Sequence, residues 1–369
     1  MSTRHANALT ARWAARLEDR QTVLSGAGAY PLLARLARYA AGPARDELLA
    51  VAPDPTPYDL ADSPGTRLAV GFWSQRGLPL SRRWRDEIPA SMRGELTGDP
   101  VVDQPVLDRW AHEETAGMIG RMPVTAGPGT AMVLASALSV LVDWAGPFTR
   151  GWCAPTDGPW RGRDLVGLHR VTADLGALRV ADTPAGPLSL LTVAGDADVD
   201  VVLALGQPRR PASAVLPAAI GALAGGPTLP QGSGPGVTEE LVQAFDDRPE
   251  LLVNTVAFTV DADHDLLQRA ELFGLAAASD ADGDHFPGIC PLLSVSQARQ
   301  STKAEFSDTG FRAAAVTALG FLVGSAPPPA TVRKRRVRLD VDRPFGFLAV
   351  HRRTGLVLVA GWVTDPTRS

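Results

Sequence analysis

Residues 308–321 have the sequence DTGFRAAAVTALGF, and this stretch decides the fold of the 369-residue chain. Side chains alternate between the two faces of a β-strand, so a strand starting after Gly310 would place every second residue on one face. One face would carry Phe311, Ala313, Ala315, Thr317, Leu319 and Phe321, and the other Arg312, Ala314, Val316, Ala318 and Gly320. The first face is apolar apart from one threonine. The pattern predicts a strand that can enter a sheet with this face against the core.

The same residues could instead form a helix. Ser307 is a suitable N-cap, and alanine favours helix by roughly a few tenths of a kcal/mol per residue. Local propensity alone therefore favours the helix. The elements that follow in the sequence reverse this preference, because they form an ordered set of which the strand is one member.

Three elements follow in order. The basic run Arg333–Arg336 opens a predicted strand, Asp342-Arg343-Pro344-Phe345 comes next, and the chain ends in a hairpin of strands 346–350 and 356–362 around the turn His351–Gly355. Serpins end with the same elements in the same order. They have an acidic residue and a glycine, an alanine-rich hinge, a variable segment, a basic strand, an Asp-Arg-Pro-Phe-like element and a closing hairpin. The C-terminal third of the chain therefore resembles a serpin. The matching residues outside the Asp-Arg-Pro-Phe element are Asp308, Gly310, Ala313, Ala314, Ala315, Thr317, Thr354, Gly361 and Pro366.

The resemblance continues more weakly toward the N-terminus, and residues 161–249 offer little to match. The matching positions include a Trp-x4-Thr-x-Gly-x-Ile segment, a Trp-x2-Pro-Phe ending of a central strand, and the region before the hinge. They are Trp110, Thr115, Gly117, Ile119, Leu134, Ala137, Trp144, Pro147, Phe148, Phe258, Asp265, Leu266, Gly274, Phe286, Gly288 and Ile289.

The resemblance implies an α+β chain with the serpin fold, in which helices surround a large mixed central β-sheet, with further sheets and an exposed reactive loop. We expect a single domain over residues 1–369. Its helical part would span about 1–125, its sheet-rich part about 126–369, and the reactive loop about 310–336.

The implied function is inhibition of a serine-type protease, once per inhibitor molecule. In this family a protease attacks the exposed loop, and the cleaved loop inserts into the large sheet and carries the acyl-enzyme with it. The family's usual spacing from Gly310 puts the reactive bond between Gly324 and Ser325. The expected hinge is Gly310, Phe311, Ala313, Ala314, Ala315 and Thr317, and possible protease contacts are Phe321, Leu322 and Val323.

The residues around the expected reactive bond suit a subtilisin-like or elastase-like protease, because they are small or apolar. The connection from Gly310 to Pro344 is longer than is usual in the family and contains Pro327-Pro328-Pro329. Counting from Gly310 therefore does not fix the reactive bond, and a second position for it remains an alternative. If Arg333–Arg336 were the bait, the target would be trypsin-like. In the family, however, the residues at this position form the strand that follows the loop, which argues against this alternative.

Four residues depart from the pattern of inhibitory serpins. Phe311 stands where a small Thr or Ser is usual, so its insertion needs an apolar pocket. Gly26 and Gly28 stand in LSGAG where the family has Phe-Ser-Pro-x-Ser, so only Ser25 matches, and Ser136 replaces an Asn of the central strand. These departures support an alternative, a non-inhibitory serpin-fold binding protein whose loop is cleaved without trapping the protease.

Composition argues against several other classes of protein. The net charge is −4 and the pI about 5.9, so we expect no nucleic-acid partner. Cys153 and Cys290 lie too far apart for a metal-binding motif or a disulfide framework. Asp280, Asp282 and Asp284 alternate, but the glycine among them is in the fourth position and not the sixth, so a calcium loop is not predicted. We expect no metal and no cofactor.

Membrane insertion and secretion are not predicted. Residues 1–17 lack the continuous apolar stretch of a secretory signal, and no run of about 18 apolar residues occurs elsewhere. We therefore expect a monomer in the cytoplasm without a membrane partner, with an extracellular location, common in the family, as the alternative.

No catalytic residue is expected, and the protein is predicted not to be an enzyme. His112, His169, His285 and His351 are accompanied by no Ser or Cys nucleophile motif. A hydrolase that uses one of these histidines is therefore the weakest hypothesis.

Hydrophobic periodicity predicts the other elements. Helices are expected at 7–17, 30–49, 106–118 and 263–273, and residues 130–141 are ambiguous between strand and helix. Strands are expected at 67–73, 167–171, 177–180, 188–193, 199–205, 251–260 and 337–341, in addition to the closing hairpin.

Overall fold

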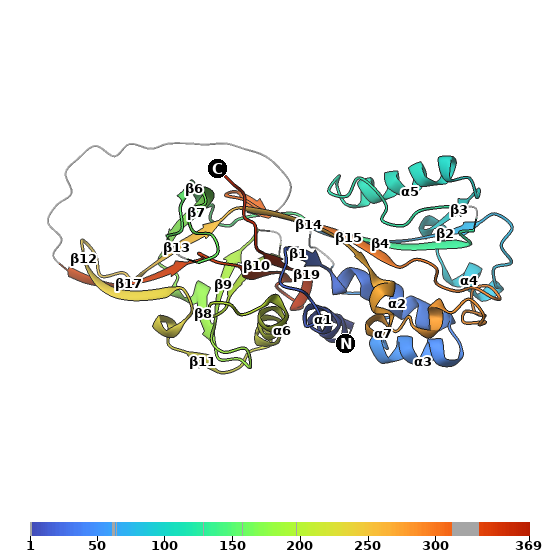
Figure 1. Cartoon of the computed structure of the whole chain (residues 1–369), viewed down its shortest axis with the longest axis horizontal. Helices are drawn as coiled ribbons and strands as arrows, with labels where there is room; N and C mark the ends of the chain where they lie inside the picture. The colour runs from blue at the N-terminus through green and yellow to red at the C-terminus, as the bar shows by residue number, and fades with distance from the viewer. Residues whose placement is uncertain are drawn as a thin grey trace.

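The computed structural model describes residues 2–60, 63, 65–127, 129–156, 158–196, 198–311 and 332–369. Within these residues the strands form four sheets with helices packed around them (Figure 1). The α-helices are α1 Ser2–Ala14, α2 Gly26–Tyr39, α3 Gly42–Val51, α4 Arg82–Glu87, α5 Pro100–Glu114, α6 Ala212–Leu223 and α7 Ala270–Phe273. Short 3₁₀ helices are η1 Ala90–Met92, η2 Leu175–Ala177, η3 Gln231–Ser233, η4 Leu266–Arg269 and η5 Ala277–Ser279.

A seven-stranded sheet lies at the centre of the hydrophobic core, in the order β1-β19-β18-β10-β9-β8-β11. Every residue of β18 and β19 is buried, because α1, α2 and α6 pack against these strands. Continuous apolar runs such as LVLVAGWV are typical of strands covered on both faces. The strands are β1 Thr22–Leu24, β8 Leu178–Ala181, β9 Leu188–Ala194, β10 Val199–Leu205, β11 Thr228–Leu229, β18 Phe345–His351 and β19 Leu356–Val363.

A five-stranded sheet contains the basic run in its interior. Its order is β12-β17-β13-β7-β6, and β17 pairs antiparallel with β12 and parallel with β13. The run Arg333–Arg336 therefore lies in a strand, as the sequence order predicted, and the structure pairs this strand on both sides. The strands are β6 Thr149–Cys153, β7 Leu165–Thr172, β12 Val237–Ala244, β13 Glu250–Val256 and β17 Val332–Asp340.

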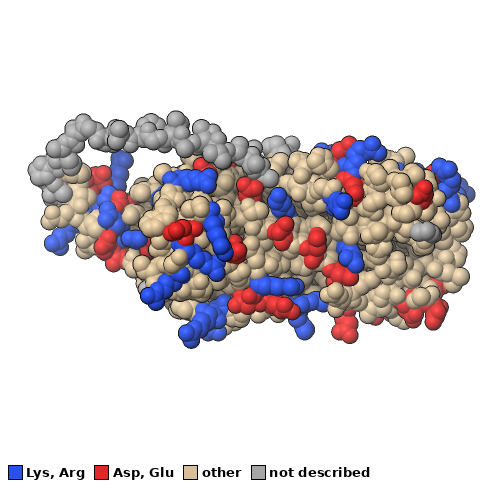
Figure 2. Space-filling view, turned by 45° about the horizontal axis from the view of Figure 1, so that its top comes forward, with Lys and Arg blue, Asp and Glu red and all other residues tan. Residues whose placement is uncertain are grey.

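Acidic residues of β12 and β13 neutralise three of the four basic side chains. Arg335 Nε lies 2.6 Å from Glu239 Oε1, and Lys334 Nζ lies 2.6 Å from Glu250 Oε2. Arg336 pairs with both Glu250 and Glu240. This ion-pair ladder holds β17 to both neighbours. Basic and acidic side chains are likewise interspersed over the face shown in Figure 2.

The two remaining sheets are connected through one continuous stretch of chain. One is four-stranded, in the order β14-β15-β16-β5, and the other is three-stranded, in the order β3-β2-β4. Only Leu141 separates β4 from β5, so these two strands are one continuous segment that contributes to both sheets. The strands are β2 Thr66–Gln75, β3 Arg93–Leu96, β4 Met132–Val140, β5 Val142–Asp143, β14 Phe258–Asp265, β15 Arg299–Phe306 and β16 Gly310–Phe311.

Three of the predicted elements differ from the observed ones. The helix expected at 30–49 is two helices, α2 and α3, because Gly42 has a positive φ of 54° and a proline follows it in the first turn. The strand expected at 251–260 is also two, β13 and β14, with the break at Ala257. The helix expected at 263–273 is wrong over its first part, since β14 continues to Asp265 by pairing with β15. Residues 130–141, ambiguous in sequence, form β4.

Close packing explains the glycine at position 26. A Cβ on Gly26 would lie 2.2 Å from Thr10 Oγ1 and 2.9 Å from the Thr10 nitrogen. The first turn of α2 thus touches the backbone of α1, and a larger residue would force the two helices apart. None of the helices in the described part of the chain is both long and apolar enough to span a membrane.

The ion-pair ladder predicts a pH-dependent contribution to stability. The Glu250 side chain is 13% exposed; burial raises its pKa, but hydrogen bonds from Lys334 and Arg336 outweigh this and lower the pKa below the ordinary value. The contribution is therefore present at neutral pH and is lost as the pH falls through the lowered pKa. Glu250→Gln should reduce the free energy of unfolding by about 1–3 kcal/mol at pH 7.

Guanidinium titrations at pH 7 and at pH 3 measure this difference. Glu240→Gln is the matched control, because its side chain is 59% exposed and its contact with Arg336 is 3.6 Å long. We expect a change below about 0.5 kcal/mol for this control. Equal effects of the two variants at pH 7 would contradict the assigned role of Glu250.

Candidate functional site

The expected hinge begins as a strand inserted between two others. Gly310 and Phe311 form β16, in which Phe311 pairs with Phe306 of β15 on one side and with Val142 of β5 on the other. A Cβ on Gly310 would lie 2.3 Å from the Val142 carbonyl oxygen, so only glycine allows this approach. Gly310 and Phe311 therefore lie in a strand and not in a helix, while their role as a hinge stays a prediction.

A tight turn positions the hinge. The Ser307 N–H donates to the Gly310 carbonyl over 2.9 Å. Trp144 holds the turn from the other side, since its Nε1 donates to the Ser307 carbonyl and its backbone N–H donates to the Thr309 carbonyl, both over 2.9 Å. The indole therefore fixes the direction in which the chain leaves β15.

Phe311 occupies an apolar pocket of the kind that its size requires. The side chain is 2% exposed, and its ring centroid lies 6.1 Å from that of Phe347 in β18. The core around Phe347 thus accommodates the large Phe311 side chain that replaces the usual small Thr or Ser. Phe311 is already buried in the described structure.

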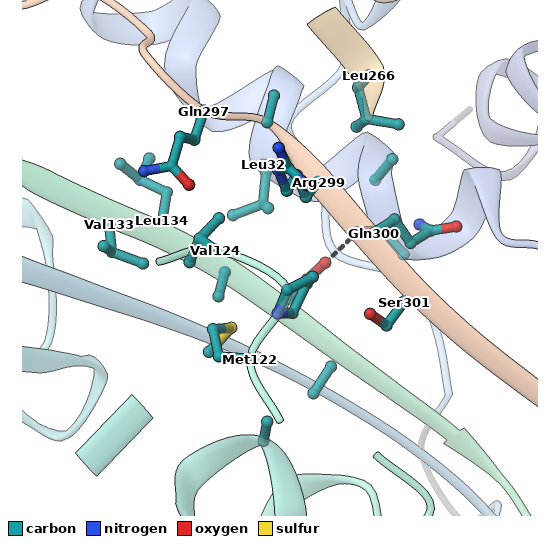
Figure 3. A pocket seen from close by; sticks show the side chains of 18 of the residues that line it. Leu32, Met122, Val124, Val133, Leu134, Leu266, Gln297, Arg299, Gln300 and Ser301 are labelled. Atoms are coloured by element: carbon teal, nitrogen blue, oxygen red, sulfur yellow. Dashed lines mark hydrogen bonds between the residues drawn. The ribbon is translucent and has the colours of Figure 1, made fainter. Parts of the chain in front are cut away.

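Below the hinge, β4 and β15 run in the same direction but belong to separate sheets. We call the space between them the slot. It contains a cavity of about 150 Å³ that is lined by both strands, by α2, and by the chain between α5 and β4 (Figure 3). Apolar side chains from these elements dominate it, among them Leu32, Leu33, Met122, Val124, Leu134 and Leu138.

The first turn of α2 bonds to both sides of the slot. Gln300 of β15 accepts from the Ser25 N–H and donates to the Ser25 carbonyl, both over 2.8 Å. Ser136 of β4 donates its hydroxyl to the Gly28 carbonyl over 2.5 Å. The Ser25 hydroxyl caps α2 by accepting from the Gly28 N–H, and it donates to Leu358 of β19. Each strand is therefore tied to α2 at this level.

Of the three departures near α2, Ser136 and Gly28 both take part in this network. Gln300 was missed by reasoning from sequence. Its only signal is parity, because it lies an even number of residues before Phe306 and so faces the same side of the sheet. Ser25 was identified as a family match, and the structure gives it the central position.

The other predicted loop residues lie outside the described part of the chain. These are the hinge residues Ala313, Ala314, Ala315 and Thr317, the possible protease contacts Phe321, Leu322 and Val323, and the bond Gly324–Ser325. Their roles stay predictions.

Ser63, His351 and the partly exposed Asp198 form a cluster that resembles a catalytic triad in composition only. Ser63 Oγ lies 2.7 Å from His351 Nε2, and Asp198 Oδ2 lies 3.3 Å from the same nitrogen. In a triad the carboxylate supports the opposite ring nitrogen, which here bonds to Thr354 Oγ1 over 2.7 Å. Burial lowers the pKa of His351, and its ring joins the closing hairpin to Ser63 and Asp198.

The acidic candidates for a metal site form loop hydrogen bonds. Asp280 accepts from the Asp282 N–H over 3.0 Å, and Asp284 accepts from the Leu292 N–H over 3.1 Å. Within the described residues, no three His, Cys, Asp or Glu side chains are placed to hold an ion together. Cys153 and Cys290 are both free thiols.

Comparison with known proteins gives the class of this arrangement. Residues 248–366 match the family model described as serpin, serine protease inhibitor. A serpin from the trematode Schistosoma haematobium superposes with a TM-score of 0.71 at 12% identity, over 100% of both chains. A structure of thyroxine-binding globulin in complex with thyroxine gives 0.69 at 16% identity, over 100% of this chain and 99% of that one. The chain thus has the α+β serpin fold throughout.

Part of the sequence is also similar to serpin sequences. The putative serpin-Z6C of rice, Oryza sativa subsp. japonica, is 40% identical over 80 residues, which are 22% of this chain and 19% of the rice protein. Matches to the curated relatives span only 19–26% of their lengths. Over residues 248–366 the chain thus matches a family described as serine protease inhibitors, and its overall fold is that of the serpins.

The burial of Phe311 predicts a measurable contribution to stability. Phe311→Ala should lower the free energy of unfolding by about 3 kcal/mol, because it removes apolar contacts and leaves a cavity beside Phe347. Phe311→Leu is the conservative control and should cost less than about 1.5 kcal/mol. Equilibrium denaturation monitored by circular dichroism measures both. If the alanine variant were as stable as the parent, Phe311 would not be held in the core.

Proposed function

We propose that this protein inhibits a serine-type protease by suicide-substrate loop insertion. The protease would cleave the loop near Gly324–Ser325, and the freed N-terminal part would enter the slot before the acyl-enzyme is hydrolysed. One observation carries the proposal: β16 already lies between β15 and β5, directly above the slot. Insertion would then start by extending this existing strand.

The register of β16 defines where later residues would lie. Phe311 is opposite Phe306 and Val142, so a strand continuing in register would put Ala313 opposite Ala304 and Val140. Thr317, the one polar residue of the inward face, would arrive opposite Gln300 and Ser136. The polar residue would therefore reach the polar level of the slot, beside the first turn of α2, where the Ser136 hydroxyl donates to Gly28 and can still accept a hydrogen bond.

Pairing with two strands at once supplies the driving force. An inserted segment would run antiparallel to both β4 and β15, and so could form backbone hydrogen bonds on each side. The alanines after Arg312 suit this step, because overpacking costs about 1–3 kcal/mol for each bulky misfit.

The target would be a subtilisin-like or elastase-like protease, bound by a monomer of this protein. Phe321, Leu322 and Val323 precede the proposed bond and would fill apolar or small pockets of such an enzyme. The trypsin-like alternative has less support, because the run Arg333–Arg336 is paired on both sides within β17. Three of its four side chains are also neutralised by the acidic residues of the ion-pair ladder.

A second candidate function is a binding protein whose loop is cleaved without trapping the protease. The observation in its favour is Phe311, a large side chain that is already seated in the core and anchors the start of the loop. The fold itself is compatible with this role, since thyroxine-binding globulin superposes on the whole chain and was solved with thyroxine.

Incubation with subtilisin, elastase and trypsin separates these candidates. An inhibitor should form a one-to-one complex with subtilisin or elastase that survives SDS, and its cleaved form should melt at a higher temperature than the intact protein. Sequencing the new N-terminus identifies the bond, which we expect to start with Ser325. Clean cleavage with neither a complex nor a rise in melting temperature would contradict the inhibitor and support the binding protein.

The two faces of the inserting strand give a matched pair of variants. Ala313→Arg would bury an unpaired charge on the face of Phe311, at a cost of several kcal/mol, and should raise the number of inhibitor molecules consumed per protease about tenfold or more. Ala314→Arg places the same charge on the face that already carries Arg312 and should change this number by less than about twofold. Titration of residual protease activity measures both, and equal values for the two variants would exclude in-register insertion.

A further inference from the structure

A segment of chain crosses the slot on the face opposite α2. We call residues 115–127, which follow α5, the strap. Met122 and Val124 of the strap line the cavity, and both pack in a second hydrophobic cluster with Val133 and Ala135 of β4 (Figure 3). The slot is therefore covered on one face by α2 and on the other by the strap.

The α5 side of the strap is held by two side chains of that helix. Gln104 donates to the Val124 carbonyl over 3.2 Å and accepts from the Ala126 N–H over 2.9 Å. Asp108 accepts from the Met122 N–H over 2.9 Å. These bonds join the strap to the element that packs on β2 and β4.

The opposite side is held by Gln297, two residues before β15. Its Oε1 accepts from the Thr125 N–H over 3.1 Å, and its Nε2 donates to the Thr125 carbonyl over 3.0 Å. One side-chain amide thus satisfies both backbone groups of Thr125, as a neighbouring strand would. Across the described residues, these two hydrogen bonds join the strap to the chain leading into β15.

The register of β16 relates this contact to the path of the loop. A strand continuing from Phe311 would stay opposite β15 until it reaches the level of Arg299, after about seven further residues. Its next residues would come level with Gln297, beneath Thr125. We call the part of the slot between the hinge and the contact of Gln297 with Thr125 the upper slot, and the part on the far side of this contact the lower slot.

We propose that the reciprocal pair between Gln297 and Thr125 is a latch that divides insertion into two stages. This inference rests on the proposed function. The loop fills the upper slot with the latch closed, and the latch must open before the last residues enter. Gln297 is a positioning residue in this process: it contacts the strap and not the protease, and it sets the time available for hydrolysis of the acyl-enzyme.

Gln297→Leu tests the latch, because leucine keeps the approximate size of the side chain and removes both hydrogen bonds. We expect insertion after cleavage to become about five- to tenfold faster, and the number of inhibitors consumed per protease to move closer to one. Stopped-flow tryptophan fluorescence measures the rate in a single turnover. Gln268→Leu, at an exposed position in η4 away from the slot, is the control and should leave both quantities unchanged.

Hydrogen–deuterium exchange of the intact protein provides a readout that does not depend on inhibition. The Thr125 amide should exchange about tenfold faster in Gln297→Leu than in the parent, whereas the Ala126 amide, held by Gln104, should keep its rate. Faster exchange at Thr125 with an unchanged insertion rate would overturn the latch, and so would unchanged exchange.

Failure of the proposed function would be recognised separately. If cleavage of the parent protein gave no rise in melting temperature, insertion itself would be absent, and the two-stage process would be overturned together with it. This measurement needs no variant. A faster-inserting Gln297→Leu protein that still formed no complex would overturn the inhibitor while keeping the latch.

Discussion

The arrangement depends on backbone hydrogen bonds that β4 and β15 do not make with each other. The two strands point in the same direction, yet over their described length they belong to separate sheets. A strand that enters between them antiparallel satisfies both edges, and β16 begins this pairing at Gly310 and Phe311. Unpaired strand edges favour the addition of another strand. In this fold, the N-terminal end of the loop, at Gly310 and Phe311, lies where that addition would start.

Side chains keep this open arrangement in place by tying each strand to a third element. On one face, Gln300 and Ser136 both bond to the first turn of α2. On the other face, the strap is bonded to α5 and to Gln297. These contacts link the two strands only through α2 or the strap. They therefore keep the strands at a fixed separation, while α2 and the strap cover the apolar residues between them. The same contacts would have to rearrange if a strand were added, so the proposed insertion would couple the stability of the intact protein to the rate of strand addition.

Local rules predicted the strand at Gly310 and Phe311 and the place of the basic run, because side-chain alternation and motif order are properties of short segments. The same parity argument identified the need of Phe311 for an apolar pocket, which Phe347 helps to provide. Gln300 and Gln297 could not be found in this way. Their partners, Ser25 and Thr125, lie 275 and 172 positions away in sequence, and only the folded chain brings each pair together.

The position of the loop within the chain has a consequence for the fate of a cut molecule. Residues 332–369 supply β17, β18 and β19, and each of these strands has neighbours on both sides. A break in the loop would therefore leave the short C-terminal piece built into the middle of two sheets. The product would be two polypeptides that migrate as one particle under native conditions and separate only on denaturation. Cleavage of the loop would therefore release no diffusible fragment.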